Sequence, residues 1–461
     1  MIMTDALPGI KRFFKGAALS PLALTMLIRL AAAFIRHDGR MSASQAAGAV
    51  RSQARHRAAL VRFLADSRWA KDWAVLTEVA ELLLRLETRH RGTWAFLLDQ
   101  TLCGQQGTKT ENTFSRGNYR KRPKKGNRKN KKLARRSCHC FVMGLLLTPS
   151  GLRIPCCRFY YTKDYCQAQK KGYRTQTQLA AELVRELAVP VAARVVVLGD
   201  TAFDSKDIRA ACRERGFHWV VPVNPERVLA GPKPRPKVSA LVKGFSADGF
   251  APVRLVSSQG PFAALRRVAR CRLGPKVKGR TYYVHQERRA VHSVGEVLLV
   301  FSTKEKPPSG KPVVVQKILM TDDVALSARQ VVELYDLRWQ IELFFKELKS
   351  TLGFHQYRFA EFAKVEGWVQ ACLVTFVYLE WYRARQLRRP GTSAEARRWW
   401  QWQRSHGLCQ ALRQEAEDHD LDQLFAWAQT RTGLKKLKKC LRAARPLEYR
   451  KPRKNQRNRA A

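Results

Sequence analysis

The sequence predicts an α/β protein in which a mixed β-sheet is flanked by helices, a mostly-β segment interrupts the sheet, and helical regions lie at both ends. Three observations predict this class. Short apolar runs of strand length alternate with helix-like stretches between residues 93 and 224. Residues 225–318 combine prolines with short alternating apolar runs, which is typical of strands joined by turns. Helix-like patterns fill residues 1–90 and resume at about 327.

The first 90 residues are expected to form a helical DNA-binding domain. The segment MSASQAAGAVRSQARHRAALVRFLAD begins with a small helix that opens at Ser42 or Ser44. A second helix follows, and its outward face would carry three arginines, namely Arg55, Arg57 and Arg62. This pattern fits a helix-turn-helix with a basic recognition helix, and it fits a plain helical bundle with a basic face equally well.

Residues 91–224 are expected to form the first part of the sheet. TWAFLLDQT is a buried strand that ends on Asp99, and CHCFVMGLLLT and LRIPCCRFYYT are two strands around a turn at 149–151. A helix over 175–188, the strand RVVVLGDTAF ending at Asp200, a helix over about 205–215 and the strand FHWVVPV follow. The order β–β–β–α–β–α–β is that of a ribonuclease-H-like fold, whose mixed sheet has helices on both faces.

The remainder of the chain divides into three predicted parts. Residues 225–318 form the β-rich insertion, with strands expected in PVRLVSS, RRVARCRL, RTYYVHQ and EVLLVFST. Residues 319–390 form the second part of the core domain that begins with residues 91–224, and they end in a long helix over 361–387. Residues 391–461 form a helical, basic C-terminal region.

One predicted helix, YDLRWQIELFFKELKSTLG, places four polar residues on one face. They are Tyr335, Arg338, Glu342 and Lys349, and their offsets keep them within about 60° of arc on a straight helix. An apolar stripe covers the opposite side, so the polar face fits ordinary solvated surface as well as a site. A carboxylate can hold a divalent cation, and the other three side chains can bind phosphate oxygens.

Three acids are the candidate catalytic and metal-binding residues. Asp99 and Asp200 each end an apolar strand, where a carboxylate is costly unless it is paired, binds a metal or caps a turn. In the predicted fold their strands are neighbours, and the helix of Glu342 packs against the sheet. Three convergent carboxylates would bind two Mg²⁺ ions, with Mn²⁺ as a substitute, and the ions would activate a water or hydroxyl nucleophile.

The charge of the chain favours a nucleic-acid partner. There are 86 Lys and Arg residues against 37 Asp and Glu residues, which gives a formal charge of +49. Residues 116–136 hold twelve Lys or Arg and no acid, and residues 431–461 hold thirteen and one acid. Such blocks are typical of arms that bind nucleic acid. Eleven cysteines without regular spacing indicate a reducing cytoplasm, and no membrane partner is expected because the apolar stretch 17–35 is interrupted by Pro21 and Arg29.

The sequence resembles the DDE transposases of the insertion-sequence-4 type. That family carries a Y-x2-R-x3-E-x6-K signature, which Tyr335, Arg338, Glu342 and Lys349 match at every position. Its second Asp is followed by an aromatic residue and often another acid, and Asp200-Thr-Ala-Phe-Asp is similar. The family also has a β-rich insertion between the second Asp and the Glu. The resemblance implies that Asp99, Asp200 and Glu342 bind the metal ions, and that the other three signature residues hold phosphates of double-stranded DNA.

The expected function is therefore metal-dependent cleavage at transposon ends and strand transfer into target DNA, by an enzyme that forms a homodimer on DNA. The resemblance implies a bacterial, cytoplasmic and nucleoid-associated protein. Two alternatives stay open at this point. One is a domesticated, non-catalytic protein that binds a specific DNA sequence, and the other is a ribonuclease-H-like nuclease that acts on RNA or hybrids.

Overall fold

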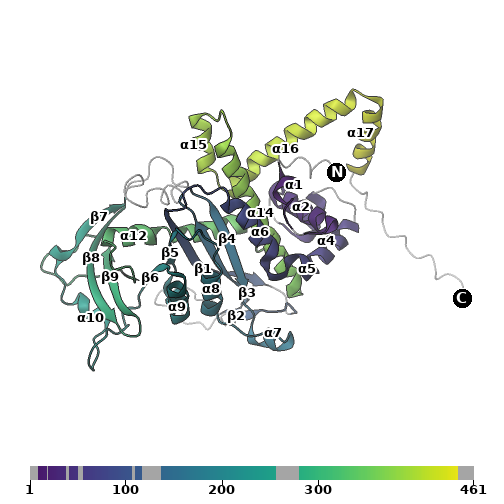
Figure 1. Ribbon diagram of the computed structural model, residues 1–461. Coiled ribbons are helices and arrows are strands. Elements are labelled where there is room, and N and C mark those ends of the chain that lie inside the picture. Colours follow the sequence, from purple (N-terminus) through teal and green to yellow (C-terminus); the bar gives the residue numbers. More distant parts are fainter. Residues whose placement is uncertain are drawn as a thin grey trace, which may run out of the picture.

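One mixed β-sheet runs through the centre of the molecule (Figure 1). The computed structural model describes residues 9–17, 19–37, 41–49, 55–105, 109–116, 136–255 and 280–444. The strand order is β2–β3–β1–β5–β6–β10–β9–β8–β7, and β4 also pairs with β3. The strands are β1 (Thr93–Gln105), β2 (Phe114–Arg116), β3 (Arg136–Leu147), β4 (Arg153–Phe159), β5 (Arg194–Leu198), β6 (His218–Pro222), β7 (Ala251–Leu255), β8 (Arg280–Val291), β9 (Gly295–Thr303) and β10 (Lys317–Thr321).

The sheet contains both parallel and antiparallel pairs, so the prediction of an α/β protein with a mixed sheet is confirmed. β1 is antiparallel to β3 and parallel to β5, β3 is antiparallel to β4, and β5 is parallel to β6. β10 is antiparallel to both β6 and β9. The predicted strands between residues 93 and 222 are all present, but β1 does not end at Asp99. It continues to Gln105 because residues 99–105 pair with β3 along their whole length.

Two helices between the strands begin where the sequence supplies capping side chains. Thr175 and Gln178 form a reciprocal capping box at the start of α8, and the Ser205 hydroxyl accepts a hydrogen bond at the start of α9. Gly216 ends α9 with a φ of 64°, a left-handed conformation that glycine adopts without strain. The helices and 3₁₀ turns of this central part are α7 (Lys163–Ala168), α8 (Gln176–Arg185), η2 (Thr201–Phe203), α9 (Lys206–Arg215), α10 (Val238–Val242) and η3 (Ala247–Gly249).

The signature segment forms two helices instead of the single helix that the sequence predicted. They are α12 (Ala328–Asp336) and α13 (Trp339–Ser350). At the junction the Arg338 N–H donates to the Tyr335 carbonyl, and the Ile341 N–H donates to the Arg338 carbonyl, each three residues back. This 3₁₀-type tightening interrupts the four-residue hydrogen-bond spacing of an α-helix. Tyr335 therefore lies on α12, while Glu342 and Lys349 lie on α13.

A long buried helix, α14 (Phe362–Arg388), joins the sheet to the N-terminal helices. It packs against α2, α4 and α6, and Gly367 lets the α14 backbone approach Leu64 so closely that a Cβ atom would lie 2.4 Å from the Leu64 carbonyl oxygen. Among the described helices, α14 is long and apolar enough to cross a membrane, but 83% of that apolar window is buried inside the protein. The N-terminal elements are α1 (Ile10–Phe13), α2 (Pro21–Arg36), α3 (Ala43–Ala49), α4 (Arg55–Ala65), α5 (Ser67–Ala70), η1 (Lys71–Trp73) and α6 (Ala74–Leu84).

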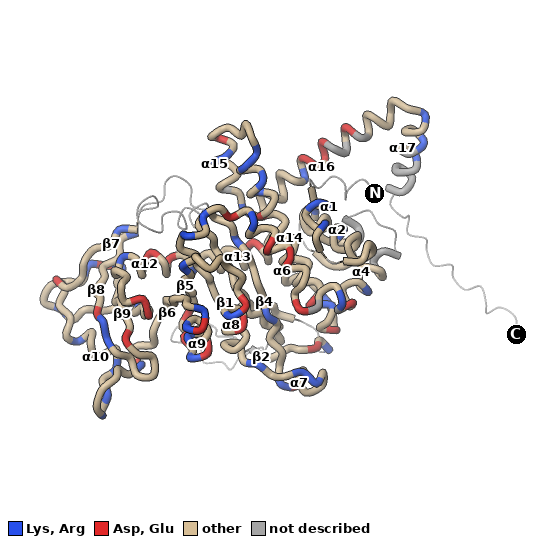
Figure 2. Tube along the Cα trace, viewed as in Figure 1, with Lys and Arg blue, Asp and Glu red and all other residues tan. Residues whose placement is uncertain are grey.

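The segment predicted as a β-rich insertion contributes β7, β8 and β9, and these strands extend the same sheet through β10. The run RRVARCRL lies outside the described residues. At the other end of the molecule, α15 (Ala394–Trp402), α16 (Ser405–Ala428) and α17 (Arg431–Ala444) follow α14, and α16 and α17 project from the body (Figure 1). Figure 2 shows acidic residues along the middle of α16 and basic residues along α17. The basic blocks 117–135 and 445–461 lie outside the described residues.

Candidate active site

Asp99 and Asp200 lie side by side at one edge of the central strands. Leu97 on β1 and Leu198 on β5 are the last paired residues of this parallel ladder. Each aspartate follows its leucine by two positions, so the shared register places the two carboxylates on neighbouring chain segments. Both residues are half-buried. The register therefore puts the two strand acids on adjacent chain segments, and β1 itself continues beyond Asp99.

The environment of Asp99 disfavours its charge. Burial raises the pKa of Asp99 to about 6, the Gln100 N–H opposes this shift by donating to Asp99 Oδ1 at 2.7 Å, and the nearby carboxylates of Asp200 and Glu342 add to it. Repulsion between acids and loss of solvent both favour the neutral form of a carboxyl group. A cation among these side chains would relieve both effects.

Asp200 also has a local structural role. Its Oδ1 accepts a hydrogen bond of 2.8 Å from the Ala202 N–H and so caps the 3₁₀ turn η2. The next acid, Asp204, is buried and forms ion pairs with Arg209 on α9 and with Arg227. These contacts hold the loop that carries Asp200 against α9. Asp200 thus caps a turn, as expected of an aspartate at a strand end, and it also lies on the segment next to Asp99.

Arg338 links the third acid to the first. Its guanidinium forms a hydrogen-bonded ion pair with Glu342, and its Nη1 lies 3.5 Å from Asp99 Oδ2. Arg338 is the residue that precedes α13, so its side chain can extend between α13 and β1. The three predicted acids therefore share one neighbourhood, with an arginine among them.

The remaining signature residues lie on either side of Glu342 along the two helices. The Tyr335 ring is half-buried, with the Arg338 guanidinium carbon 5.9 Å from its centre. Lys349 Nζ donates to the Leu102 carbonyl oxygen on β1 at 3.3 Å. The sequence did not single out Lys317 on β10, whose ammonium lies 4.8 Å from the centre of the Tyr335 ring.

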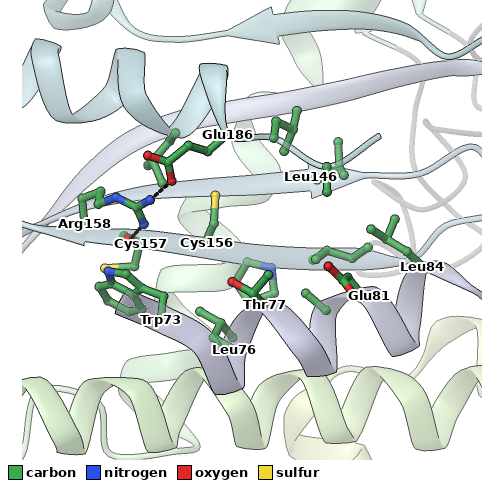
Figure 3. Close-up of a pocket in the computed structure, with 16 residues that line it drawn as sticks. Trp73, Leu76, Thr77, Glu81, Leu84, Leu146, Cys156, Cys157, Arg158 and Glu186 are labelled. Atoms are coloured by element: carbon green, nitrogen blue, oxygen red, sulfur yellow. Dashed lines mark hydrogen bonds and ion pairs between the residues drawn. The ribbon is translucent and has the colours of Figure 1, made fainter. Parts of the chain in front are cut away.

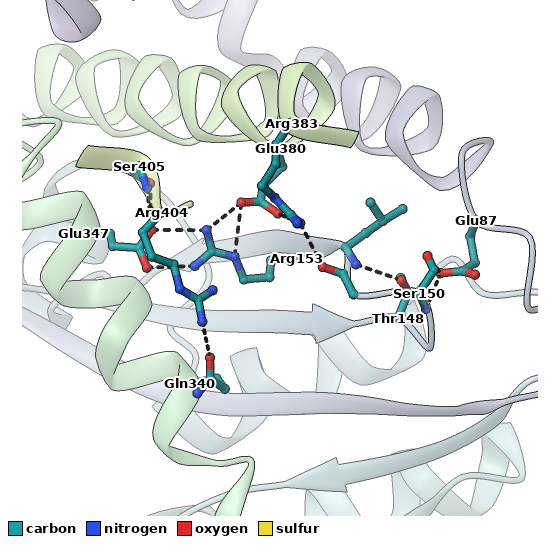
Figure 4. A network of polar contacts seen from close by, with 12 residues as sticks. Glu87, Thr148, Ser150, Arg153, Gln340, Glu347, Glu380, Arg383, Arg404 and Ser405 are labelled. Atoms are coloured by element: carbon teal, nitrogen blue, oxygen red, sulfur yellow. Dashed lines mark hydrogen bonds and ion pairs between the residues drawn. The ribbon is translucent and has the colours of Figure 1, made fainter. Parts of the chain in front are cut away.

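Sequence reasoning also missed the buried ion-pair network that holds α13 in place (Figure 4). Arg153 on β4 donates to Glu347 on α13 at 2.8 and 3.1 Å and to Glu380 on α14 at 2.5 and 3.1 Å. Arg383 donates to the other oxygen of Glu380 at 2.8 Å, and the Ser405 hydroxyl and N–H donate to Glu347 at 2.7 and 3.1 Å. Burial alone would raise the pKa of Glu380, but Arg153 and Arg383 lower it to about 2.

The donor set of the site suits a hard divalent cation, because Mg²⁺ and Mn²⁺ bind carboxylate oxygens. The gathering of Asp99, Asp200 and Glu342 in one neighbourhood is the feature that favours such an ion here. Within the described ranges, no three acidic, histidine or cysteine side chains stand in an arrangement ready to hold a metal. Since Arg338 already holds Glu342, an ion that binds both Asp99 and Glu342 would require Arg338 to move.

The predicted DNA-binding residues of the N-terminal region lie apart from this site. Arg62 is exposed on α4, whose Leu60 and Leu64 are buried. Arg55 and Arg57 lie on the same helix, but their side chains fall outside the described part of the structure. A groove of about 100 Å³ lies between α6, β4 and α8, and none of Asp99, Asp200 and Glu342 lines it (Figure 3). Its lining is largely apolar, and Arg158 pairs with Glu186 at one end.

Comparisons with known proteins give two family matches. The model described as "Transposase DDE domain" matches residues 166–378, a range that includes Asp200 and Glu342. The model described as "DDE superfamily endonuclease" matches residues 24–244, a range that includes Asp99 and Asp200. Dependence on a divalent metal is general among DDE endonucleases.

No curated protein matches the chain significantly. Among solved structures, the cryo-EM structure of a piggyBac transposase synaptic complex with hairpin DNA is 11% identical, covers 91% of this chain and 79% of its own, and gives a TM-score of 0.40. The two family matches support a DDE-type transposase, an enzyme of the nuclease type.

Proposed function

We propose that this protein is a DNA transposase of the insertion-sequence-4 type, which cleaves transposon ends in a metal-dependent reaction and joins them to target DNA. The observation that carries the proposal is the placement of Asp99 and Asp200 at matching positions after the paired residues of β1 and β5, with Arg338 linking Glu342 to Asp99. The segment from Tyr335 to Lys349 matches the family signature, and this match supports the insertion-sequence-4 type.

The proposed catalytic core of the protein is a ribonuclease-H-like sheet. The adjacent strands β4, β3, β1, β5 and β6 support it, because three antiparallel neighbours are followed by two strands parallel to β1. β4 is covered on both faces, since Arg153 reaches α14 and Arg158, on the opposite face, reaches Glu186 beyond α8. A rigid, covered sheet holds carboxylates at fixed separations, which two-metal chemistry requires.

In this proposal Asp99, Asp200 and Glu342 bind two Mg²⁺ ions, with Mn²⁺ as a substitute. Bound ions of this kind lower the pKa of an attacking water or 3′ hydroxyl and stabilise the leaving oxygen. The carboxylates fix the ions relative to the sheet. Arg338, Tyr335 and Lys349 bind phosphate oxygens of the DNA end and orient the phosphodiester for in-line attack.

Double-stranded DNA is the proposed partner, both as transposon end and as target. The excess charge of +49 would strengthen binding to any polyanion, and the exposed Arg62 on α4 is the candidate contact of the N-terminal region for end recognition. A cytoplasmic, nucleoid-associated location in a bacterium accompanies this proposal.

The proposed assembly on DNA is a homodimer, and the C-terminal helices are the surface that best fits a second copy. Leu421 and Phe425 on α16 and Leu434 on α17 are exposed apolar residues on elements that project from the body. Such side chains are costly in water unless a partner covers them. Sedimentation of the protein with end DNA should give two proteins per complex, and Phe425→Ser should shift it toward one.

Cleavage of a duplex that carries the terminal inverted repeat tests the proposed reaction. Glu342→Gln and Asp200→Asn should each abolish Mg²⁺-dependent nicking while DNA binding remains, because both replacements keep side-chain shape but remove a charged ligand. Glu296→Gln, which changes an exposed acid on β9, is the control and should cleave like the wild-type protein. Metal-dependent cleavage that survives Glu342→Gln or Asp200→Asn would contradict the proposal.

Two other functions are distinguished by simple observations. A domesticated protein would bind DNA without any nicking in Mg²⁺ or Mn²⁺, although the retention of all three acids speaks against this reading. A ribonuclease-H-like host nuclease would cleave RNA or hybrids, and its gene would lack flanking inverted repeats. The presence of short inverted repeats around the coding sequence favours the transposase.

A further inference from the structure

Two lysines lie near the two ends of the segment that carries Glu342: Lys349 on α13, and Lys317 on β10, which contacts Tyr335 of α12. Lys349 follows Glu342 by seven residues, or about 10 Å of helix rise, and contacts Leu102 on β1. Lys317 lies against the ring of Tyr335, which precedes Glu342 by seven residues. One lysine therefore marks the β1 side of the acids and the other marks the β10 side.

The sheet places both lysines at the edge that carries the acids. β10 runs antiparallel to β6, and Leu319 pairs with Pro222 at the end of β6, so Lys317 lies just beyond the carboxyl ends of β5 and β6. Asp200 follows the carboxyl end of β5. β1 and β10 are separated by β5 and β6, which corresponds to a lateral distance of about 14 Å at the usual strand spacing.

The surroundings of Lys317 favour an anion. In the described part of the chain, neither Lys317 nor Lys349 forms an ion pair with a carboxylate, and Lys317 instead contacts an aromatic ring. Burial, together with the nearby positive charges of Arg338 and Lys304, lowers the pKa of Lys317, and the Glu342 carboxylate opposes this shift. Among the described side chains, Lys317 carries no ion pair of its own beside these positive charges, and a phosphate beside it would offset their repulsion.

We propose that Lys317 is a DNA-contacting residue of this site, and that Lys317 and Lys349 bind backbone phosphates on opposite sides of the phosphodiester that is cleaved. The cleaved strand then crosses the sheet edge from β1 toward β10 and passes over the acids. This inference rests on the proposed function and adds a direction for the DNA path and a residue outside the family signature.

Binding of neutralised DNA tests the path. The probe is a duplex bearing the terminal inverted repeat, with single methylphosphonate linkages placed one at a time on each side of the cleavage position, and Ca²⁺ replaces Mg²⁺ to allow binding without cleavage. Each linkage that contacts a lysine should weaken wild-type binding. Lys317→Met should lose its sensitivity to linkages on one side only, and Lys349→Met on the other side only.

The variants are chosen to separate charge from packing. Methionine keeps an apolar stem over the Tyr335 ring, and Lys317→Arg restores the charge. Lys317→Met should reduce the slope of log K against log salt concentration by about 1. Lys243→Met, which removes an exposed lysine after α10, is the control and should keep the wild-type methylphosphonate pattern.

The outcomes distinguish this inference from the proposed function. The path is wrong if Lys317→Met cleaves DNA like the wild-type protein and keeps the wild-type sensitivity to each methylphosphonate linkage. It is also wrong if both lysine variants lose sensitivity on the same side of the cleavage position. Either result leaves the transposase proposal intact. An absence of metal-dependent cleavage by the wild-type protein would instead overturn the proposed function. Equal melting temperatures for wild-type protein and Lys317→Met show that a changed pattern does not come from unfolding.

Discussion

Arg153 on β4 and Glu347 on α13 form a two-hydrogen-bond ion pair in the protein interior, although 194 residues separate them in the chain. The Arg153 guanidinium also binds Glu380 and stacks 5.0 Å from the centre of the Phe376 ring. Glu347 lies five residues after Glu342. The network therefore fixes the helix that carries the third acid against the edge strand of the core (Figure 4).

Removing the arginine should destabilise the fold strongly. Arg153→Met leaves two buried carboxylates without their shared partner, and breaking such a pair costs about 3–5 kcal/mol. Urea denaturation of the variant should therefore show a much lower midpoint than that of the wild-type protein. Arg158→Met on the same strand is the control, because Glu186, its partner, is largely exposed, and the loss there should stay below about 1 kcal/mol. Equal midpoints for the two variants would contradict the role assigned to Arg153.

The network also explains a limit of sequence reasoning. Strand and helix periodicity located β1, β3, β4, β5 and β6 and the two aspartates, because apolar runs and the acids that follow them are local features. Arg153 and Glu380 each interrupt an apolar run, and nothing local identifies their partner. The break between Tyr335 and Glu342 was not predicted because the helical pattern of the sequence continues through it. β10 was not predicted because KILMT is short and lies beside the proline-rich segment.

Acid should weaken the protein through His139. This buried imidazole on β3 lies 2.8 Å from the Tyr357 hydroxyl and 2.9 Å from the Glu111 carbonyl oxygen, and burial lowers the pKa of His139 to about 4. An unfolded histidine has a pKa of about 6.5, so the unfolded state binds the proton first as the pH falls. Stability from this residue is complete above about pH 6.5 and is lost as the pH falls toward 4, by about 2 kcal/mol at pH 5.

His139→Gln keeps polar atoms at this position but does not titrate. The difference in unfolding free energy between pH 7.5 and pH 5 should therefore be smaller in this variant than in the wild-type protein. His406→Gln removes an exposed imidazole and serves as the control, with a pH dependence that follows the wild type. If His139→Gln and wild type lose equal stability between these pH values, the neutral buried state of His139 is wrong.

The contact between α4 and α14 should not tolerate a side chain at residue 367. A Cβ on Gly367 would lie 2.4 Å from the Leu64 carbonyl oxygen, a backbone atom that cannot rotate away. Gly367→Ala should therefore cost about 1–3 kcal/mol and increase hydrogen exchange in α4. Gly104→Ala, where no atom lies within 4 Å of the added carbon, should leave exchange in α4 unchanged. An α4 that exchanges equally in both variants would show that the helices do not pack in this way.

Arg338 should oppose metal binding in the absence of DNA and support cleavage in its presence. Its positive charge contacts Glu342 and lies 3.5 Å from Asp99 Oδ2, so it competes with a cation for the same carboxylates. Removing that charge in Arg338→Met should tighten Mn²⁺ binding to the free protein by on the order of tenfold, since charges at about 4 Å interact by several kcal/mol near a protein surface before screening. Paramagnetic resonance of free Mn²⁺ measures this affinity without any reaction.

The same variant should cleave end DNA more slowly, because the proposed contact between Arg338 and a DNA phosphate is lost. Arg288→Met, which removes an exposed arginine on β8, is the control and should leave Mn²⁺ affinity unchanged. Weaker Mn²⁺ binding in Arg338→Met would mean that the arginine organises the carboxylates for the ion instead of competing with it.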